Sequence, residues 1–249
     1  MSGTLNSVSV KKSAPEREVA RGNANSVQDH SIFPVTGSDD VMAVDLFCGA
    51  GGLTYGLQRA GITVVEGVDI DGACRYAYEV NNGSRFIHKS ALDYTADDAA
   101  TALDGAKVRV LAGCAPCQPF STYTQGPRGN HRDKWALLDR FGELARSVLP
   151  DIVSMENVTP LAVTDRFKSF VDELEEAGFR VKHWIVDCRE YGAPQQRRRL
   201  VLLASRHGEI DILPPTHKHP EQWTAVRDVI GDMPPLGAGE TDTGDPLHR

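Results

Sequence analysis

Apolar runs typical of buried β-strands alternate with segments of helical spacing from residue 41 to residue 206. VMAVDLF (41–47) is rich in apolar residues, whereas WALLDRFGELARSVL (135–149) repeats them at the spacing of an amphipathic helix. Such alternation is typical of an α/β fold with a doubly wound, mostly parallel sheet. The predicted strands are 41–47, 62–70, 107–114, 151–157, 180–188 and 198–206, and the predicted helices are 53–61, 73–82, 135–149 and 166–179.

The last two predicted strands differ from the others because no helix separates them. They are joined by the short segment EYGAPQQR. A parallel crossover needs a dozen residues or more, so a short connection implies an antiparallel pair. We therefore predict an antiparallel strand pair at the C-terminal side of the sheet.

The two ends of the chain lack the alternation. Residues 1–40 are polar and mixed in charge, and we expect a disordered N-terminal arm. Residues 207–249 form a polar, turn-rich segment in which AVRDVIGDM could make one short helix. The sequence thus predicts one folded domain over residues 41–206.

No apolar run is long enough to span a membrane, and the N-terminus lacks the apolar core of a secretory signal. We therefore expect a cytoplasmic protein whose cysteines are mostly thiols. The formal net charge of −7 does not suit a protein that holds a polyanion unless a local basic face exists.

The segment DLFCGAGGLTYG lies between a predicted strand and a predicted helix. Its glycines, Gly49, Gly51 and Gly52, allow a tight turn and close approach to a ligand. The dinucleotide spacing G-x-G-x-x-G is not met, because residue 54 is Thr. Asp69 ends the next strand, where a carboxylate can accept hydrogen bonds from a ribose. A ribose-binding carboxylate without the dinucleotide spacing suggests an adenosine-type cofactor such as S-adenosylmethionine. The alternative is a glycine-rich structural turn.

The segment GCAPCQPFS (113–121) holds two cysteines and allows three interpretations. A redox pair would open a helix, but a loop-like sequence follows. A zinc site needs about four ligands, and no second C-x-x-C exists. A nucleophile fits better: Cys117 lies just beyond a strand end, whereas Cys114 is expected to be a packed small residue. Two buried structural thiols remain the alternative.

Two further motifs lie at strand boundaries: MENV (155–158) ends one predicted strand, and QQRRR (195–199) starts another. Glu156, in MENV, would lie on the same rim as Cys117 and could hold or donate a proton. In QQRRR (195–199), strand alternation would send Arg197 and Arg199 to one face, where guanidiniums can bind a base edge, a phosphate or a carboxylate. Alternatively, Glu156 is an ordinary surface carboxylate, and QQRRR is a solvated basic cluster.

Together, DLFCGAGG, GCAPCQPFS, ENV and QQRRR resemble the motifs of the DNA cytosine-5 methyltransferase family, in their usual order. The resemblance runs from about Met42 to Asp232. It implies a Rossmann-like, S-adenosylmethionine-dependent methyltransferase that methylates carbon 5 of cytosine in duplex DNA, of the restriction-modification type.

The resemblance also implies residue roles. Cys117 would attack carbon 6 of a flipped cytosine, Glu156 would contact N3 and the exocyclic amine, and Arg197 and Arg199 would hold the base. The implied cofactor-binding residues are Phe47, Gly49, Gly51, Gly52, Asp69, Ile70, Asp93 and Pro116. The implied DNA-contacting residues are Gln118, Ser121, Arg128, Arg132, Lys134 and Gln195, most of them in a loop that closes over the base. No metal is implied.

The sequence departs from the family pattern in two places. An aspartate usually contacts the adenine amine after the third strand; here FIHKSALDY places Ser90 there, with Asp93 following. Family members also continue with a target recognition domain after the region matched by residues 207–249. Three explanations stay open: a truncated chain, one subunit of a split enzyme whose partner chain supplies recognition, or an inactive homologue. A transfer-RNA substrate is a further alternative.

Overall fold

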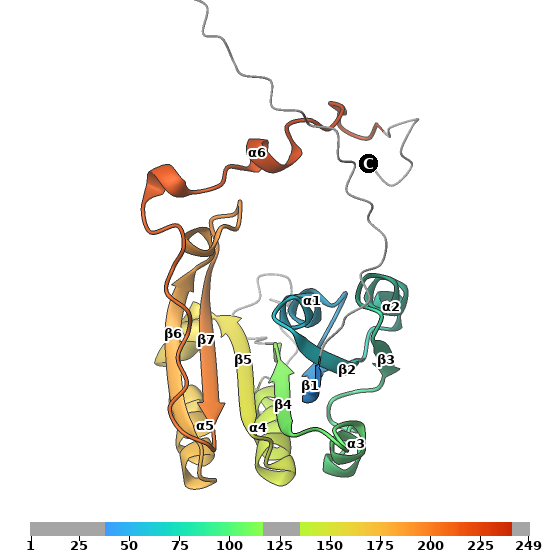
Figure 1. Ribbon diagram of the computed structural model, residues 1–249, viewed down its shortest axis with the longest axis vertical. Helices are drawn as coiled ribbons and strands as arrows, with labels where there is room; N and C mark the ends of the chain where they lie inside the picture. Colours follow the sequence, from blue (N-terminus) through green and yellow to red (C-terminus); the bar gives the residue numbers. More distant parts are fainter. Residues whose placement is uncertain (1–37, 117–134, 241–249) are drawn as a thin grey trace, which may run out of the picture. The chain divides into compact units, whose positions relative to one another are not determined.

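The computed structural model describes residues 38–116 and 135–240, which hold a seven-stranded sheet in the order β3-β2-β1-β4-β5-β7-β6 (Figure 1). The strands are β1 (Ser38–Leu46), β2 (Ile62–Asp69), β3 (Arg85–His88), β4 (Val108–Gly113), β5 (Ile152–Val158), β6 (Arg180–Asp187) and β7 (Arg198–Ser205). The helices are α1 (Gly52–Arg59), α2 (Arg75–Asn82), α3 (Ala96–Ala102), α4 (Ala136–Val148), α5 (Asp165–Glu176) and α6 (Val226–Ile230).

The predicted sheet type is confirmed. Strands β3, β2, β1, β4 and β5 pair in parallel, and β7 pairs antiparallel with both β5 and β6. The short connection between β6 and β7 therefore makes the antiparallel pair expected from its length. Insertion of β7 between β5 and β6 brings the start of β7 beside the end of β5, and both lie at the carboxyl edge of the parallel strands.

Helices cover the two faces of the sheet unequally. Helices α3, α4 and α5 lie side by side on one face, over a large core that includes Leu46, Leu111 and Met155 (Figure 1). Helices α1 and α2 lie on the other face, where Ala43 and Val64 form a smaller apolar cluster with Leu57 of α1. Successive residues of a strand therefore pack into two separate cores, one on each face of the sheet, because side chains alternate with period 2.

Several boundaries differ from the sequence prediction, and two elements were not predicted from their apolar pattern. Strand β1 begins at Ser38, ahead of the expected boundary at 41, and ends before Phe47. Helix α3 is short, and its main signal is a capping box in which Thr95 and Asp98 bond each other's main chain. Strand β3 has only four residues, too few to show a clear period.

After β7 the described chain contains α6, within the segment AVRDVIGDM where one short helix was expected, and a short 3₁₀ turn (Pro220–Gln222) that was not predicted. Among the described residues, no helix is both long enough and apolar enough to cross a membrane.

Candidate active site

The loops that follow β1, β2, β4 and β5 all leave the same edge of the sheet, because these strands are parallel. This edge receives the glycine loop, Asp69, Pro116 and Glu156. The start of the antiparallel strand β7 adds Arg199 to the same edge, opposite Val158. The topology therefore brings together residues that the sequence separates widely.

The glycine loop turns sharply directly after β1. Phe47 has φ +60°, a conformation that non-glycine residues adopt rarely, and its N–H donates to the Val68 carbonyl at 2.8 Å. Gly49 and Gly51 also have positive φ, +51° and +94°. A Cβ on Gly51 would lie 2.1 Å from Nδ2 of Asn82, so α2 packs too closely for any other residue.

The outward side of the same loop is open. Among residues 38–116 and 135–240, a Cβ built on Gly49 or on Gly52 meets no atom within 4 Å. The loop therefore leaves space for a ligand on one side and is packed on the other. Strained backbone next to open space is typical of a binding loop.

Asp69 fixes the glycine loop to the end of β2. Its Oδ2 accepts the Gly49 N–H at 2.9 Å, and its Oδ1 accepts the Asp71 N–H at 2.9 Å. Each carboxylate oxygen can accept a further hydrogen bond, so the group can still receive ribose hydroxyls. Ile70, next in the chain, is a large apolar side chain with 71% exposure.

The turn after β3 separates the roles of Ser90 and Asp93. The Ser90 hydroxyl accepts the Leu92 N–H at 3.2 Å, and its carbonyl accepts the N–H groups of Asp93 and Tyr94. Ser90 therefore stabilises the turn itself, whereas the Asp93 side chain is exposed.

A buried polar network lies under the glycine loop, and the sequence prediction missed it. The Thr54 hydroxyl donates to Asp45 Oδ2 at 2.7 Å and lies 3.1 Å from the Tyr78 hydroxyl. Burial raises the pKa of Asp45 to about 7, against the opposing effect of the Thr54 hydrogen bonds. In the described part of the chain, the buried Asp45 Oδ1 has no hydrogen-bond partner. The signal in the sequence was an aspartate inside an otherwise apolar strand.

Glu156 and Arg199 form the central ion pair on the other side of the edge. Arg199 Nε lies 2.7 Å from Glu156 Oε1, with side-chain exposures of 20% and 32%. Arg199 also donates from Nη1 to the Arg198 carbonyl at 2.8 Å. Two bonds hold the guanidinium in one orientation, and the pair remains accessible from solvent.

The predicted nucleophile and most predicted DNA contacts lie outside the described residues. Those residues are Cys117, Gln118, Ser121, Arg128, Arg132 and Lys134. The first described segment ends at Pro116, which is exposed. The Cys114 N–H donates to the Leu46 carbonyl at 3.3 Å, and Asn157 Nδ2 donates to the Ala115 carbonyl at 2.9 Å. The segment that leads to Cys117 is thus anchored to β1 and β5; the ENV motif contained Asn157, but no role was predicted for it.

Cys114 has the properties of a packed thiol. Burial raises its pKa, and the nearby Glu156 carboxylate raises it further. The thiol therefore stays protonated near neutral pH, which makes it a poor nucleophile.

Gln195 and Arg197 precede β7 and are exposed. The Arg197 carbonyl accepts the Cys188 N–H at 2.8 Å, which closes the connection between β6 and β7. Within the described ranges, no group of three His, Cys, Asp or Glu side chains is placed to hold a metal ion.

The sheet order, the glycine loop and the acidic residue at the end of β2 define a Rossmann-like methyltransferase fold. A family model described as C-5 cytosine-specific DNA methylase matches residues 41–243, and the chain belongs to this family.

Individual relatives agree with this assignment. The chain is 46% identical over 208 residues to the Type II methylase M.HgiDII of Herpetosiphon aurantiacus, covering 82% of this chain and 58% of the relative. It is 34% identical over 203 residues to the Type II methyltransferase M.XorII of Xanthomonas oryzae, covering 78% and 46%. The crystal structure of S. pombe Dnmt2 methyltransferase shares the fold, with a TM-score of 0.57 and 20% identity over 69% of this chain and 51% of that chain. The chain spans about half the length of the curated relatives it matches.

Proposed function

We propose that this chain is the catalytic domain of a DNA cytosine-5 methyltransferase of the restriction-modification type. It transfers the methyl group of S-adenosylmethionine to carbon 5 of a cytosine flipped out of duplex DNA. The observation that carries the proposal is the Glu156–Arg199 pair, which lies at the strand edge where Asn157 anchors the segment leading to Cys117.

The glycine-loop side of the edge fits S-adenosylmethionine. Gly49 and Gly52 leave open space, Asp69 can accept ribose hydroxyls, and the exposed Ile70 offers an apolar surface for adenine. Phe47 and Gly51 shape the loop, Asp93 is the carboxylate available to the adenine amine, and Pro116 borders the site. The cofactor supplies an electrophilic methyl group.

The residues of this chain supply the rest of the chemistry. The Cys117 thiolate adds to carbon 6 of cytosine, while the Glu156 carboxyl group holds N3 and the exocyclic amine. Carbon 5 then becomes nucleophilic enough to take the methyl group. Loss of the carbon 5 proton and departure of the Cys117 thiolate restore the ring. A covalent adduct replaces one difficult step with two easier ones.

Arg199 and Arg197 hold the base and the Glu156 side chain. Arg128, Arg132 and Lys134 supply positive charge to the loop that covers the base, while Gln118, Ser121 and Gln195 contact the DNA. Extruding a base costs a few kcal/mol, which closure of a charged loop offsets. We assign recognition of the target sequence to residues beyond the 41–206 domain, on this chain or on a second chain.

The test is transfer of a radiolabelled methyl group from S-adenosylmethionine to mixed-sequence duplex DNA, followed by nucleoside analysis. Label in 5-methylcytosine supports the proposal, and Cys117→Ser should remove it while Cys114→Ser retains most of it. Equal loss from both variants, with folding intact, would instead favour a function for the cysteine pair. If cofactor binding is normal but label is absent even when the part of M.HgiDII that this chain does not cover is added, the proposal is wrong.

A further inference from the structure

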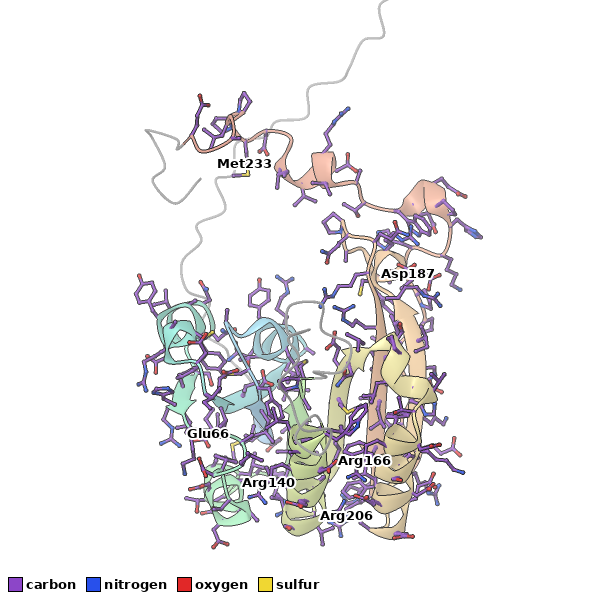
Figure 2. All side chains as sticks on the ribbon, turned by 180° about the vertical axis from the view of Figure 1, so that it is seen from behind. Glu66, Arg140, Arg166, Asp187, Arg206 and Met233 are labelled. Carbon is purple, nitrogen blue, oxygen red and sulfur yellow. The ribbon has the colours of Figure 1, made fainter. Side chains whose placement is uncertain are left out.

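The C-terminal segment folds back on the connection between β6 and β7. We call residues 213–223 the strap and residues 188–197 the hairpin turn. Asp187, the last residue of β6, is labelled in Figure 2 where the hairpin turn begins. The strap contacts this turn in three ways. The Trp223 ring of the strap packs against Arg189, main-chain atoms form a hydrogen bond, and the Tyr191 hydroxyl of the turn donates to the strap.

Arg189 is held on two sides. Its guanidinium lies 3.8 Å from the centroid of the Trp223 ring and forms a bidentate pair with Asp187, with distances of 3.0 Å and 2.6 Å. The Trp223 ring is itself fixed, because its Nε1–H donates to the His217 carbonyl at 3.1 Å. A planar guanidinium between a carboxylate and an aromatic face has little freedom left.

Two hydrogen bonds tie the strap to the main chain of the turn. The His217 N–H donates to the Glu190 carbonyl at 2.9 Å, and the Tyr191 hydroxyl donates to the Leu213 carbonyl at 2.9 Å. Gly192 has φ +85°, and a Cβ there would lie 3.1 Å from the His217 ring. The turn and the strap therefore fit each other closely.

The hairpin turn in turn fixes the main chain at Arg197 and Arg199. The Cys188 N–H donates to the Arg197 carbonyl, and the Ala193 N–H donates to the Cys188 carbonyl at 3.1 Å. Arg198 then pairs with Asp187, and Arg199 with Val186, across the strand ladder. The hairpin turn thus sets the position from which Arg199 reaches Glu156.

We propose that Trp223 is a positioning residue that, through Arg189 and the hairpin turn, holds Arg197 and Arg199 in place for the cytosine site. The strap, which lies outside the domain of residues 41–206, therefore completes the site. The part of this inference that concerns cytosine rests on the proposed function; the part that concerns Arg199 does not.

The first experiment needs no catalysis. Side-chain Nε–Hε signals of arginine are recorded by ¹H–¹⁵N NMR, with Arg199 assigned from Arg199→Lys. In Trp223→Ala, hydrogen exchange of the Arg199 signal should accelerate roughly tenfold, the size expected for loss of one Arg–aromatic contact. Trp223→Phe keeps a ring face for Arg189 and should restore most of the protection. Unchanged exchange in folded Trp223→Ala would overturn the proposal.

The second experiment measures methyl transfer. Trp223→Ala should raise the KM for DNA roughly tenfold, while the Kd for S-adenosylmethionine stays within about twofold. Tyr55→Ala is the matched control, because it removes another Arg–aromatic contact, with Arg59 on α1; the KM for DNA should then be unchanged. Absence of transfer by the wild type would count against the proposed function alone, whereas equal effects of both variants would overturn the role of Trp223.

Discussion

The carboxylates on the two sides of the strand edge are held in opposite ways. On the glycine-loop side, Asp69 accepts two main-chain N–H groups, and Asp45 accepts the Thr54 hydroxyl. On the other side, at the ends of β5 and β7, which we propose binds cytosine and call the cytosine side, Glu156 is paired with Arg199. Among the contacts of the described residues, no cation pairs with Asp45, Asp69 or Asp71, whereas the hairpin turn, the start of β7 and the strap carry Arg189, Arg197, Arg198 and Lys218.

Within a chain of net charge −7, negative charge therefore lies on the glycine-loop side of the edge and positive charge lies on the other side. Two main-chain N–H groups fix the Asp69 carboxylate without cancelling its negative charge, which suits the positive sulfonium of the proposed cofactor. Arg199 pairs with Glu156, and the neighbouring Arg197 and Arg198 add positive charge, which suits a polyanion. Two neighbouring sites can therefore bind ligands of opposite charge.

The strongest way to test the cytosine side is Glu156→Gln. The amide keeps the shape but cannot supply the carboxyl proton chemistry, so kcat should fall roughly 10²–10⁴-fold. The Kd for S-adenosylmethionine, measured by calorimetry, should remain within about twofold of wild type. Unchanged turnover would remove Glu156 from the mechanism, and a large change in cofactor affinity would show that the two sides are not independent.

Asp45 allows the buried network to be tested through stability. Its pKa of about 7 exceeds that of an unfolded aspartate, so the native state binds more protons between about pH 4 and 7. This contribution is complete below about pH 4 and is lost as the pH rises through 7. The loss is on the order of 4 kcal/mol at most.

The measurement is urea unfolding of wild type and Asp45→Asn at pH 5 and pH 8. Asparagine can still accept the Thr54 hydrogen bond but does not titrate. The variant should therefore gain free energy of unfolding relative to wild type as the pH rises. A difference between the two proteins that is the same at both pH values would contradict the assignment.

Sequence reasoning placed residues correctly where their position follows directly from a strand boundary, while their roles stay predictions. Asp69, Glu156 and Arg199 lie at strand ends, and the order of parallel strands places their ends at one edge. It failed for contacts between residues far apart in the chain, such as Thr54 with Tyr78 and Asn157 with Ala115, which are separated by 24 and 42 residues. The strap was missed for the same reason, since its polar sequence gives no periodic signal.

Asp69→Asn tests the hydrogen bonds by which Asp69 holds the main chain on the glycine-loop side. One oxygen becomes an amide nitrogen, which would then face the N–H of Gly49 or Asp71. The affinity for S-adenosylmethionine should fall roughly 10–100-fold, as measured by calorimetry. Asp71→Asn is the matched control, because the Asp71 side chain accepts the Ala73 N–H on the exposed side of the turn. Similar losses in both variants would mean that the turn, and not Asp69, determines affinity.

Asn157 lies where the two sides meet, because it belongs to β5 but bonds the chain that leaves β4. Asn157→Asp would place a carboxylate oxygen against the Ala115 carbonyl, so the segment leading to Cys117 should shift. We expect kcat to fall roughly tenfold, with cofactor Kd within about twofold, since a broken buried hydrogen bond costs about 1–3 kcal/mol. Single-turnover methyl transfer would measure this, with Ser154→Ala on the same strand as control. If cofactor affinity falls as much as turnover, the Asn157–Ala115 hydrogen bond supports both sides of the strand edge. The two sides would then be mechanically coupled although they differ in charge.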